Sequence, residues 1–153
     1  MTSRPILLVE DDSNSVTFFE YAMKTVKIAN PLHVAVDGME ALEYIEGTGK
    51  FANRAAHPTP GLVLLDLRMP RATGFEVLER LRDSGRQGRL AVVVFTGSAS
   101  DADIARAYAL GANGYLVKPT TLADLVAIVR AINDFWLTHN YPPPPRPRLD
   151  SSP

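Results

Sequence analysis

Four short apolar runs in this sequence each end at a polar side chain, and the polar types complement one another. The first run ends in three acids, the second in an aspartate, the third in a threonine and the fourth in a lysine, at Glu10-Asp11-Asp12, Asp66, Thr96 and Lys118. Clustered carboxylates repel one another unless a cation joins them, and Mg²⁺ prefers such hard oxygen ligands. An aspartate beside a divalent cation can accept a phosphoryl group, whose oxygens a lysine can neutralise and a hydroxyl can contact. These residue types therefore predict metal-assisted phosphoryl chemistry.

The elements that would position these side chains follow an alternating pattern of strands and helices. Five apolar runs alternate with helical patterns, near residues 6–9, 32–36, 62–65, 91–95 and 115–117. This alternation is typical of a doubly wound parallel α/β sheet that helices cover on both faces. In open parallel sheets, ligands bind beyond the carboxyl ends of the strands. We therefore expect the acids, the threonine and the lysine to gather at one edge of the sheet.

Capping residues predict where the helices begin and end. The five helices are expected to begin, in chain order, at Ser13 or Asn14, Asp37, Gly74, Ser100 and Thr121. The second and fourth are expected to end near Gly47 and Gly111, because glycine readily adopts the left-handed conformation that closes a helix. The last helix has a predicted core stripe of Leu122, Leu125, Val129, Ile132 and Trp136. It also has a second apolar line that the core does not explain, formed by Ile128, Ala131 and Phe135.

Length, charge and cysteine content limit the classes of function. A chain of 153 residues fits one domain, which we expect over 4–140, followed by a flexible proline-rich tail over 141–153. With 16 basic and 17 acidic residues the net charge is −1, too little to hold nucleic acid by phosphate neutralisation. The absence of cysteine excludes disulfides and thiolate sites. The N-terminal segment resembles neither a signal peptide nor a membrane span, so we expect a cytoplasmic protein with no membrane partner and no output domain.

Each side chain of the predicted site has an ordinary structural explanation when it is taken alone. Acids are favoured at helix N-termini, and Asp66 could be a turn residue. Thr96 and Lys118 could be solvated ends of strands. The combination of all four kinds at four strand ends is much harder to explain without a shared ligand.

Two other features have simple explanations. The loop over 48–60 is expected to be a solvated surface insertion. The three histidines, His33, His57 and His139, are too scattered in the sequence to predict a metal site.

The four motifs together closely resemble the receiver domain of two-component response regulators. The resemblance covers about residues 4–137 and rests on Ile6 to Asp12, Leu64 to Pro70, Thr96 and Lys118-Pro119, in the family's order and on its strand ends. It implies a flavodoxin-like sheet of five parallel strands in the order 2-1-3-4-5, with five helices. It also implies a protein that accepts a phosphoryl group from a sensor histidine kinase and then changes its association surface.

The resemblance assigns a role to each matching position. Asp66 corresponds to the phospho-acceptor, Asp11 to the direct ligand of Mg²⁺ (or Mn²⁺), and Glu10 to the acid that reaches the metal through water. Asp12 corresponds to a bystander. The family's remaining protein ligand is a backbone carbonyl, here that of Arg68.

The resemblance also assigns the residues that contact and sense the phosphoryl group. Lys118 corresponds to the phosphoryl-contacting lysine, and its bond to Pro119 is expected to be cis. Thr96 corresponds to the switch hydroxyl, and Tyr115 to the aromatic that couples the site to the face of the fourth helix, fifth strand and fifth helix. Tyr115 could instead be a half-buried edge aromatic. Thr73 departs from the family pattern, which often has an acid before the glycine that begins the third helix, here Gly74.

A narrower resemblance links the chain to the small stand-alone receivers that partner bacterial and cyanobacterial phytochrome kinases. It rests on Leu32 to Gly38, the long loop to Pro60 and the Phe135-Trp136-Leu137 ending. In that subgroup's pattern, the second apolar line of the last helix suits a homodimer. Packing of this line under the tail is the alternative.

Other classes of protein use similar residues. An aspartate-nucleophile phosphotransferase or phosphatase of the haloacid-dehalogenase type would have a second acid where this chain has Arg68. A flavodoxin-like binding module would have a phosphate cradle rich in glycine and hydroxyl groups after the first strand, where this chain has acids. A protein-binding pseudo-receiver that is never phosphorylated is disfavoured because all the key residues are present. We therefore expect a phospho-accepting signalling protein, not an enzyme.

Overall fold

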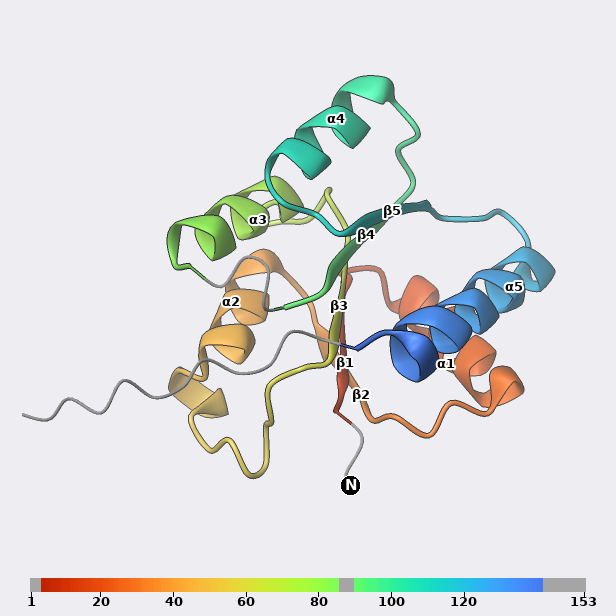
Figure 1. The fold of residues 1–153 in the computed structure, drawn as a ribbon, viewed down its shortest axis with the longest axis horizontal. Coiled ribbons are helices and arrows are strands. Elements are labelled where there is room, and N and C mark those ends of the chain that lie inside the picture. The colour runs from red at the N-terminus through yellow and green to blue at the C-terminus, as the bar shows by residue number, and fades with distance from the viewer. Residues whose placement is uncertain (1–3, 86–89, 142–153) are drawn as a thin grey trace, which may run out of the picture.

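The computed structural model describes residues 4–85 and 90–141, which form one parallel sheet with helices on both faces (Figure 1). The strands are β1 (Ile6–Val9), β2 (Leu32–Ala35), β3 (Leu62–Leu65), β4 (Val92–Thr96) and β5 (Gly114–Val117). They lie in the order β2-β1-β3-β4-β5, which confirms the predicted topology. Val9 at the end of β1 pairs with both Ala35 and Leu65, so the carboxyl ends of three neighbouring strands are level.

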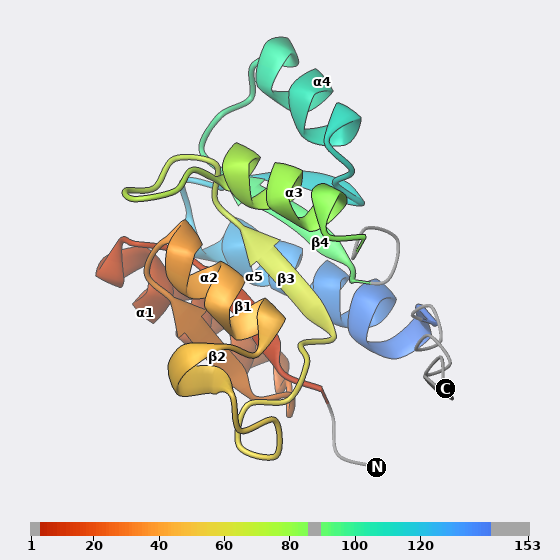
Figure 2. The same ribbon diagram turned by 90° about the vertical axis from the view of Figure 1, so that its left-hand side faces the viewer.

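The helices form two layers around the sheet. They are α1 (Ser13–Val26), α2 (Gly38–Glu46), α3 (Gly74–Asp83), α4 (Asp101–Ala109) and α5 (Leu122–Ile132), with a 3₁₀ turn η1 (Gly49–Phe51) and a π-helical segment η2 (Asn133–His139). Helices α1 and α5 pack together on one face, and α2, α3 and α4 cover the other (Figure 1 and Figure 2). This arrangement leaves the carboxyl edge of the sheet to the loops that follow the strands.

Each central strand contributes to two cores because successive side chains point to opposite faces. In β1, Leu7 and Val9 join the cluster beneath α2 and α3, whereas Ile6 and Leu8 join the cluster beneath α1 and α5. All four side chains are at most 2 % exposed. Burial of one such side chain stabilises the fold by about 1.5–3 kcal/mol. Coverage on both faces explains why the strands are continuous apolar runs.

The N-cap of α1 differs from the prediction. Asp12 caps this helix by accepting a hydrogen bond from the Asn14 N–H at 3.0 Å, whereas Ser13 and Asn14 are inside the helix. An aspartate is an effective cap because its carboxylate binds the free N–H groups and carries negative charge at the positive end of the helix dipole. The remaining N-caps are Asp37, Thr73, Ser100 and Thr121.

The segment over 48–60 is a surface insertion with mostly exposed residues, as predicted, but a few of its side chains anchor it to the domain. Phe51 is only 2 % exposed and joins the core cluster beneath α2. Arg54 donates hydrogen bonds to the carbonyls of Tyr44 and Ile45 near the end of α2, and to that of His57. Carbonyls in the last turn of a helix have no partner within it, and a cation there is favourable. One buried ring and one guanidinium thus hold the segment in place.

The last helix matches its predicted core stripe only in part. Leu125, Val129 and Ile132 are buried, but Leu122 is 41 % exposed. Leu122 is the first residue of α5 and lines a surface pocket with Phe18, so it does not reach the core. In the second apolar line, Ile128 is half-buried, whereas Ala131 and Phe135 are exposed.

Two further predictions concern the chain ends and membranes. From residue 142 onward, the proline-rich tail predicted over 141–153 lies outside the described residues. Within residues 4–85 and 90–141, no helix combines the length and the apolar character that crossing a membrane requires.

Candidate functional site

The polar residues that end the strands meet at the carboxyl edge of the sheet. Backbone hydrogen bonds extend the strand pairing to these residues: the Asp66 N–H donates to the Val9 carbonyl at 3.2 Å, and the Lys118 N–H donates to the Thr96 carbonyl at 2.7 Å. The backbone of each polar residue is therefore fixed by its neighbouring strand. This pairing explains how residues from distant parts of the sequence reach one place.

Asp66 lies at the centre of the site and is 6 % exposed. The Thr96 hydroxyl donates a hydrogen bond to Asp66 Oδ1 at 2.9 Å, and the Lys118 ammonium donates to Oδ2 at 2.8 Å. The Arg68 N–H also donates to Oδ1, at 3.2 Å. Three donors, from the end of β4, the residue after β5 and the loop that follows Asp66 itself, thus orient one buried carboxylate.

The acidic residues form a cluster suited to a divalent cation. Glu10, Asp11 and Asp66 can each place one carboxylate oxygen so that all three lie within 4.8 Å of one another. Glu10 and Asp66 are buried, whereas Asp11 is exposed, so the cluster is open to solvent on one side. Hard oxygen donors with room for water are the ligand set that Mg²⁺ and Mn²⁺ prefer. The donor set therefore fits the predicted metal.

Lys118 partly offsets the charge of this cluster. Its ammonium contacts Glu10 as well as Asp66. Burial raises the pKa of Glu10, although the hydrogen bond from Lys118 opposes this effect. Burial by itself would lower the pKa of Lys118, but the hydrogen bonds to Asp66 and Glu10 raise it above its usual value. Lys118 is therefore a permanent cation between two carboxylates.

Comparison with known proteins decides among the classes that this chemistry allows. Residues 6–130 match the response regulator receiver domain family. Response regulator Rcp1 of Synechocystis sp. is 36 % identical to the chain over 132 residues, which cover 86 % of this chain and 88 % of Rcp1. The chain is a response regulator receiver domain.

Solved structures of related response regulators share the fold of this receiver. The Mn²⁺-bound form of Rcp1 has a TM-score of 0.82 at 35 % identity, over 92 % of the receiver and 99 % of Rcp1. The phosphorylated cyanobacterial phytochrome response regulator RcpA has a TM-score of 0.84 at 33 % identity, over 93 % and 99 % of the two chains. RPA3017, a response regulator in red light signaling of R. palustris, has a TM-score of 0.87 at 34 % identity, over 93 % and 99 %. The receiver thus has phytochrome response regulators among its homologues.

The peptide bond between Lys118 and Pro119 of the receiver is trans, so the prediction of a cis bond is wrong for this structure. The trans isomer of a bond before proline is favoured by about 0.5–1 kcal/mol. Moreover, the Lys118 ammonium reaches both Glu10 and Asp66 with the trans bond. The observed contacts of Lys118 therefore do not depend on the cis isomer.

Tyr115 is connected to the loop after β4. The Tyr115 ring is half-buried against the core, and its hydroxyl donates a hydrogen bond to the Ser98 carbonyl at 2.9 Å. The Ser98 hydroxyl donates to Asp103 in α4 at 2.6 Å, and the Arg68 guanidinium donates to the same carboxylate at 2.9 Å. The hydrogen bond from Ser98, together with Arg68, lowers the pKa of Asp103. This network joins the loop after the receiver's Asp66 to α4 and β5.

Sequence reasoning missed the role of Asp103 in this network. It also missed the contact between Asp37 and Arg71. Asp37 caps α2, and its carboxylate also forms an ion pair with the Arg71 guanidinium at a distance of 3.3 Å. Arg71 lies in the loop after β3 and has a φ of 68°, which is unfavourable for a residue with a side chain. An acid in a cap position was visible in the sequence, but its distant partner was not.

The start of α3 leaves no room for a side chain larger than hydrogen. A Cβ atom at Gly74 would lie 2.4 Å from the backbone carbonyl oxygen of Asp66. The Gly74 N–H donates to the Leu67 carbonyl at 3.1 Å. The departure Thr73 keeps a working cap, because its hydroxyl accepts a hydrogen bond from the Glu76 N–H at 3.3 Å. Gly74 thus allows α3 to pack against the loop that carries Asp66.

Proposed function

We propose that this receiver accepts a phosphoryl group on Asp66 from a phosphorylated histidine of a sensor kinase, with Mg²⁺ or Mn²⁺. The observation that carries the proposal is the buried Asp66 carboxylate held by Thr96 and Lys118 beside two further acids. We assign residues 4–140 to the receiver domain. Since the donor kinase consumes ATP, we place the reaction in the cytoplasm.

The metal would be held by the residues of the acidic cluster. Asp11 and Asp66 would bind it directly, Glu10 through a water and Arg68 through its backbone carbonyl. When bound, the cation offsets the charge of the carboxylates and of the transferring phosphoryl oxygens. The exposed position of Asp11 supports this assignment, because the metal and the phosphoryl group must both enter from solvent.

The remaining chemistry belongs to the protein's own side chains. An Asp66 oxygen attacks phosphorus while the phosphorus–nitrogen bond of the donor histidine breaks. Lys118 is in place to neutralise a phosphoryl oxygen, because its ammonium is 2.8 Å from Asp66 Oδ2. The Thr96 hydroxyl, which donates to Asp66 Oδ1, can donate to a phosphoryl oxygen instead. Arg68 occupies the position of the second acid of a dehalogenase-type phosphatase, which supports a signalling role instead of catalysis on a small substrate.

A matched pair of substitutions at neighbouring acids tests the metal assignment. At limiting Mg²⁺, Asp11→Asn is expected to slow phosphorylation by acetyl phosphate at least about tenfold, since loss of even an indirect metal contact costs about 10–100-fold. Asp12→Asn is the control, because asparagine caps a helix as well as aspartate does. The gain of one phosphoryl group is followed by the mass of the intact protein, with chelator as the blank.

Two outcomes would contradict the proposal. Equal rates for Asp11→Asn and Asp12→Asn would remove Asp11 from the metal site. Sustained hydrolysis of a phosphomonoester by the unmodified protein, with no phosphoryl adduct, would indicate an enzyme in place of a receiver.

We propose that the kinase contacts the exposed face of α1 next to the site. Phe18 is 54 % exposed and lines a small pocket with Lys118 and Pro119. Tyr21, three residues further along the same helix, is also 54 % exposed. A protein that brings a phosphohistidine to Asp66 has to cover this rim, and exposed aromatic side chains are frequent binding hot spots.

Phe18→Asp is therefore expected to weaken kinase binding by about 2 kcal/mol, or roughly thirtyfold in transfer at low kinase concentration. Phosphorylation by acetyl phosphate is expected to be unchanged. Tyr108→Asp, at a 50 % exposed aromatic of α4, is the matched control.

Transfer is measured from a phosphorylated phytochrome kinase, the partner class that the homologues support. Transfer from another kinase but not from the light-sensing one would refute the phytochrome assignment, and equal transfer to all variants would remove Phe18 from the interface.

We propose a homodimer through the last helix, formed by the second apolar line. Phe135 is 53 % exposed, and its ring meets the Trp136 ring edge-on at 5.0 Å, which holds it in place. Ala131 is exposed one turn earlier, and the half-buried Ile128 continues the line toward the domain. A self-complementary apolar line of this kind suits a two-fold contact.

Phe135→Asp is expected to make the protein monomeric at concentrations where the unmodified protein is dimeric. A buried charge without a partner is costly, so the dissociation constant should rise at least about tenfold. Light scattering measures the dissociation constant of the dimer. Repeating the measurement with a beryllofluoride phosphoryl mimic tests whether dimerisation depends on the proposed switch residues Thr96 and Tyr115. Tyr21→Asp on α1 is the control. A monomer at all concentrations, unchanged by the substitution, would exclude this dimer.

A further inference from the structure

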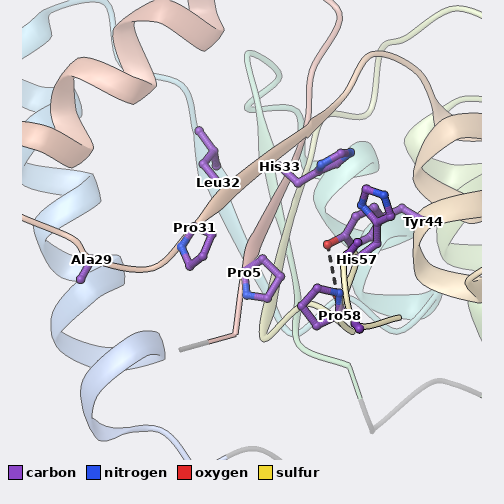
Figure 3. A pocket seen from close by; sticks show the side chains of 10 residues that line it. Pro5, Ala29, Pro31, Leu32, His33, Tyr44, His57 and Pro58 are labelled. Carbon is purple, nitrogen blue, oxygen red and sulfur yellow. Dashed lines mark hydrogen bonds between the residues drawn. The ribbon is translucent and has the colours of Figure 1, made fainter. Parts of the chain in front are cut away.

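A second concave site lies at the end of the sheet opposite to Asp66. Pro5 and Pro31, which precede β1 and β2, line an open pocket of about 550 Å³ at the amino ends of these strands (Figure 3). This volume is within the range of about 300–1,000 Å³ that is usual for ligand sites. None of the residues that line it belongs to the phosphoryl site. The pocket is therefore separate from the phosphoryl site.

Two histidines that are distant in the sequence meet at one end of this pocket. His33 lies in β2 and His57 in the segment over 48–60, and their ring centres are 6.0 Å apart. Figure 3 shows both rings beside Tyr44. The His33 ring stacks on the Tyr44 ring at 4.4 Å, and the Tyr44 hydroxyl donates to the Pro58 carbonyl at 3.1 Å. Two of the three histidines that are scattered in the sequence are therefore neighbours in the fold.

One nitrogen of this pair lacks a partner. Within residues 4–85 and 90–141, Nε2 of His33 is the one buried side-chain nitrogen or oxygen that makes no hydrogen bond. Buried polar atoms are nearly always paired, so an unpaired one indicates a missing water, ion or ligand. Burial lowers the pKa of His33, with Glu40 opposing and His57 and Lys50 adding to this effect. The imidazole is therefore neutral near pH 7, the form that binds metals.

We propose that His33 and His57 bind one transition-metal ion, such as Ni²⁺ or Zn²⁺, with waters from the open pocket completing its coordination. Metal–nitrogen bonds of about 2.0–2.1 Å would hold two imidazole centres roughly 4.5–6.5 Å apart, the larger values at wide nitrogen–metal–nitrogen angles. The observed separation of 6.0 Å lies at the upper end of this range, so the two rings would move slightly closer on binding. Imidazole favours these ions, whereas carboxylate and water favour Mg²⁺ and Mn²⁺. The two ends of the sheet thus select different metals, and an ion at this pocket links β2 to the 48–60 segment.

The proposal is tested by titrating the full, untagged chain with Ni²⁺ in the presence of saturating Mg²⁺. Paramagnetic broadening in ¹H–¹⁵N spectra is expected at residues 33, 44 and 55–57 before it occurs near residue 66. His57→Ala is expected to weaken this Ni²⁺ binding at least about tenfold. Removing a residue that only supports a metal ligand already lowers metal affinity about 10–100-fold, and removing the ligand itself should cost no less. His139→Ala is the matched control and is expected to bind Ni²⁺ like the unmodified protein.

A second variant separates metal binding from packing. His33→Phe keeps a ring on Tyr44 but removes both nitrogens, so it is expected to remain folded and to lose the broadening. Zn²⁺ should raise the melting temperature of the unmodified protein by mass action but not that of His57→Ala. No broadening at residues 33 and 55–57, or equal Ni²⁺ affinity in His57→Ala and the unmodified protein, would overturn the proposal.

Discussion

Replacing Asp66 with asparagine is expected to abolish phosphoryl gain completely while leaving the fold intact. The amide keeps an oxygen that can accept the hydrogen bonds now made to Oδ1 by the Thr96 hydroxyl at 2.9 Å and the Arg68 N–H at 3.2 Å. The local geometry is therefore preserved. An amide is not a competent nucleophile toward phosphorus, so the chemical step is lost.

Intact-mass measurement after incubation with Mg²⁺ and acetyl phosphate checks this expectation, and peptide mapping of the unmodified protein locates the phosphoryl group. Asp103→Asn is the matched control, because Asp103 is a carboxylate of the same rim that hydrogen-bonds Ser98 and Arg68. It should still gain one phosphoryl group. An Asp66→Asn protein that gains a phosphoryl group at the normal rate would place the acceptor elsewhere.

Lys118→Met is expected to have the second largest effect, on both rate and stability. The ammonium lies between Asp66 and Glu10, whose side chains are only 8 % and 4 % exposed. Removing one partner of a buried ion pair costs about 3–5 kcal/mol, since the remaining charge is uncompensated. Loss of one group that stabilises developing charge lowers a rate by about 10²–10³-fold. The variant should therefore unfold at lower urea and be phosphorylated slowly.

Magnesium distinguishes the two effects of this substitution. A cation bound by the acidic cluster restores compensation for the two carboxylates, so Mg²⁺ should recover much of the lost stability. It does not replace the ammonium at the phosphoryl group, so the rate should stay low. Urea unfolding with and without Mg²⁺, together with intact-mass kinetics, measures both quantities.

Lys50→Met is the matched control for Lys118→Met. Lys50 is 66 % exposed and pairs with Glu40 at 3.6 Å on the surface. Such pairs contribute about 0–1 kcal/mol, so this variant should unfold like the unmodified protein. If Lys118→Met were no less stable than Lys50→Met in the absence of Mg²⁺, Lys118 would not be compensating buried carboxylates.

The two predictions describe one electrostatic arrangement. Three carboxylates gather at the edge of the sheet, with the Lys118 ammonium against two of them. The remaining negative charge is what a divalent cation can offset. Phosphorylation of Asp66 would change this balance at a carboxylate that Thr96 contacts, whereas Tyr115 of β5 contacts the loop between β4 and α4.

The sequence by itself determined the strands, the helices and the edge at which the chemistry occurs. Runs such as Ile6–Val9 and Leu62–Leu65 are strands whose side chains are buried on both faces of the sheet. Glu10 and Asp66 follow these strands directly. Parallel strands place their carboxyl ends on one side, so polar residues after several strands must come together. Caps such as Asp37 and Thr121 were also predictable, because a cap depends on residues within one turn of the chain.

Only the tertiary structure decided which distant side chains touch. Lys118 contacts Glu10 across 108 residues of sequence, and the His33–His57 pair forms because Arg54 and Phe51 fix the 48–60 segment beside β2. Periodicity and capping depend on near neighbours in the chain, whereas these contacts depend on how whole elements pack.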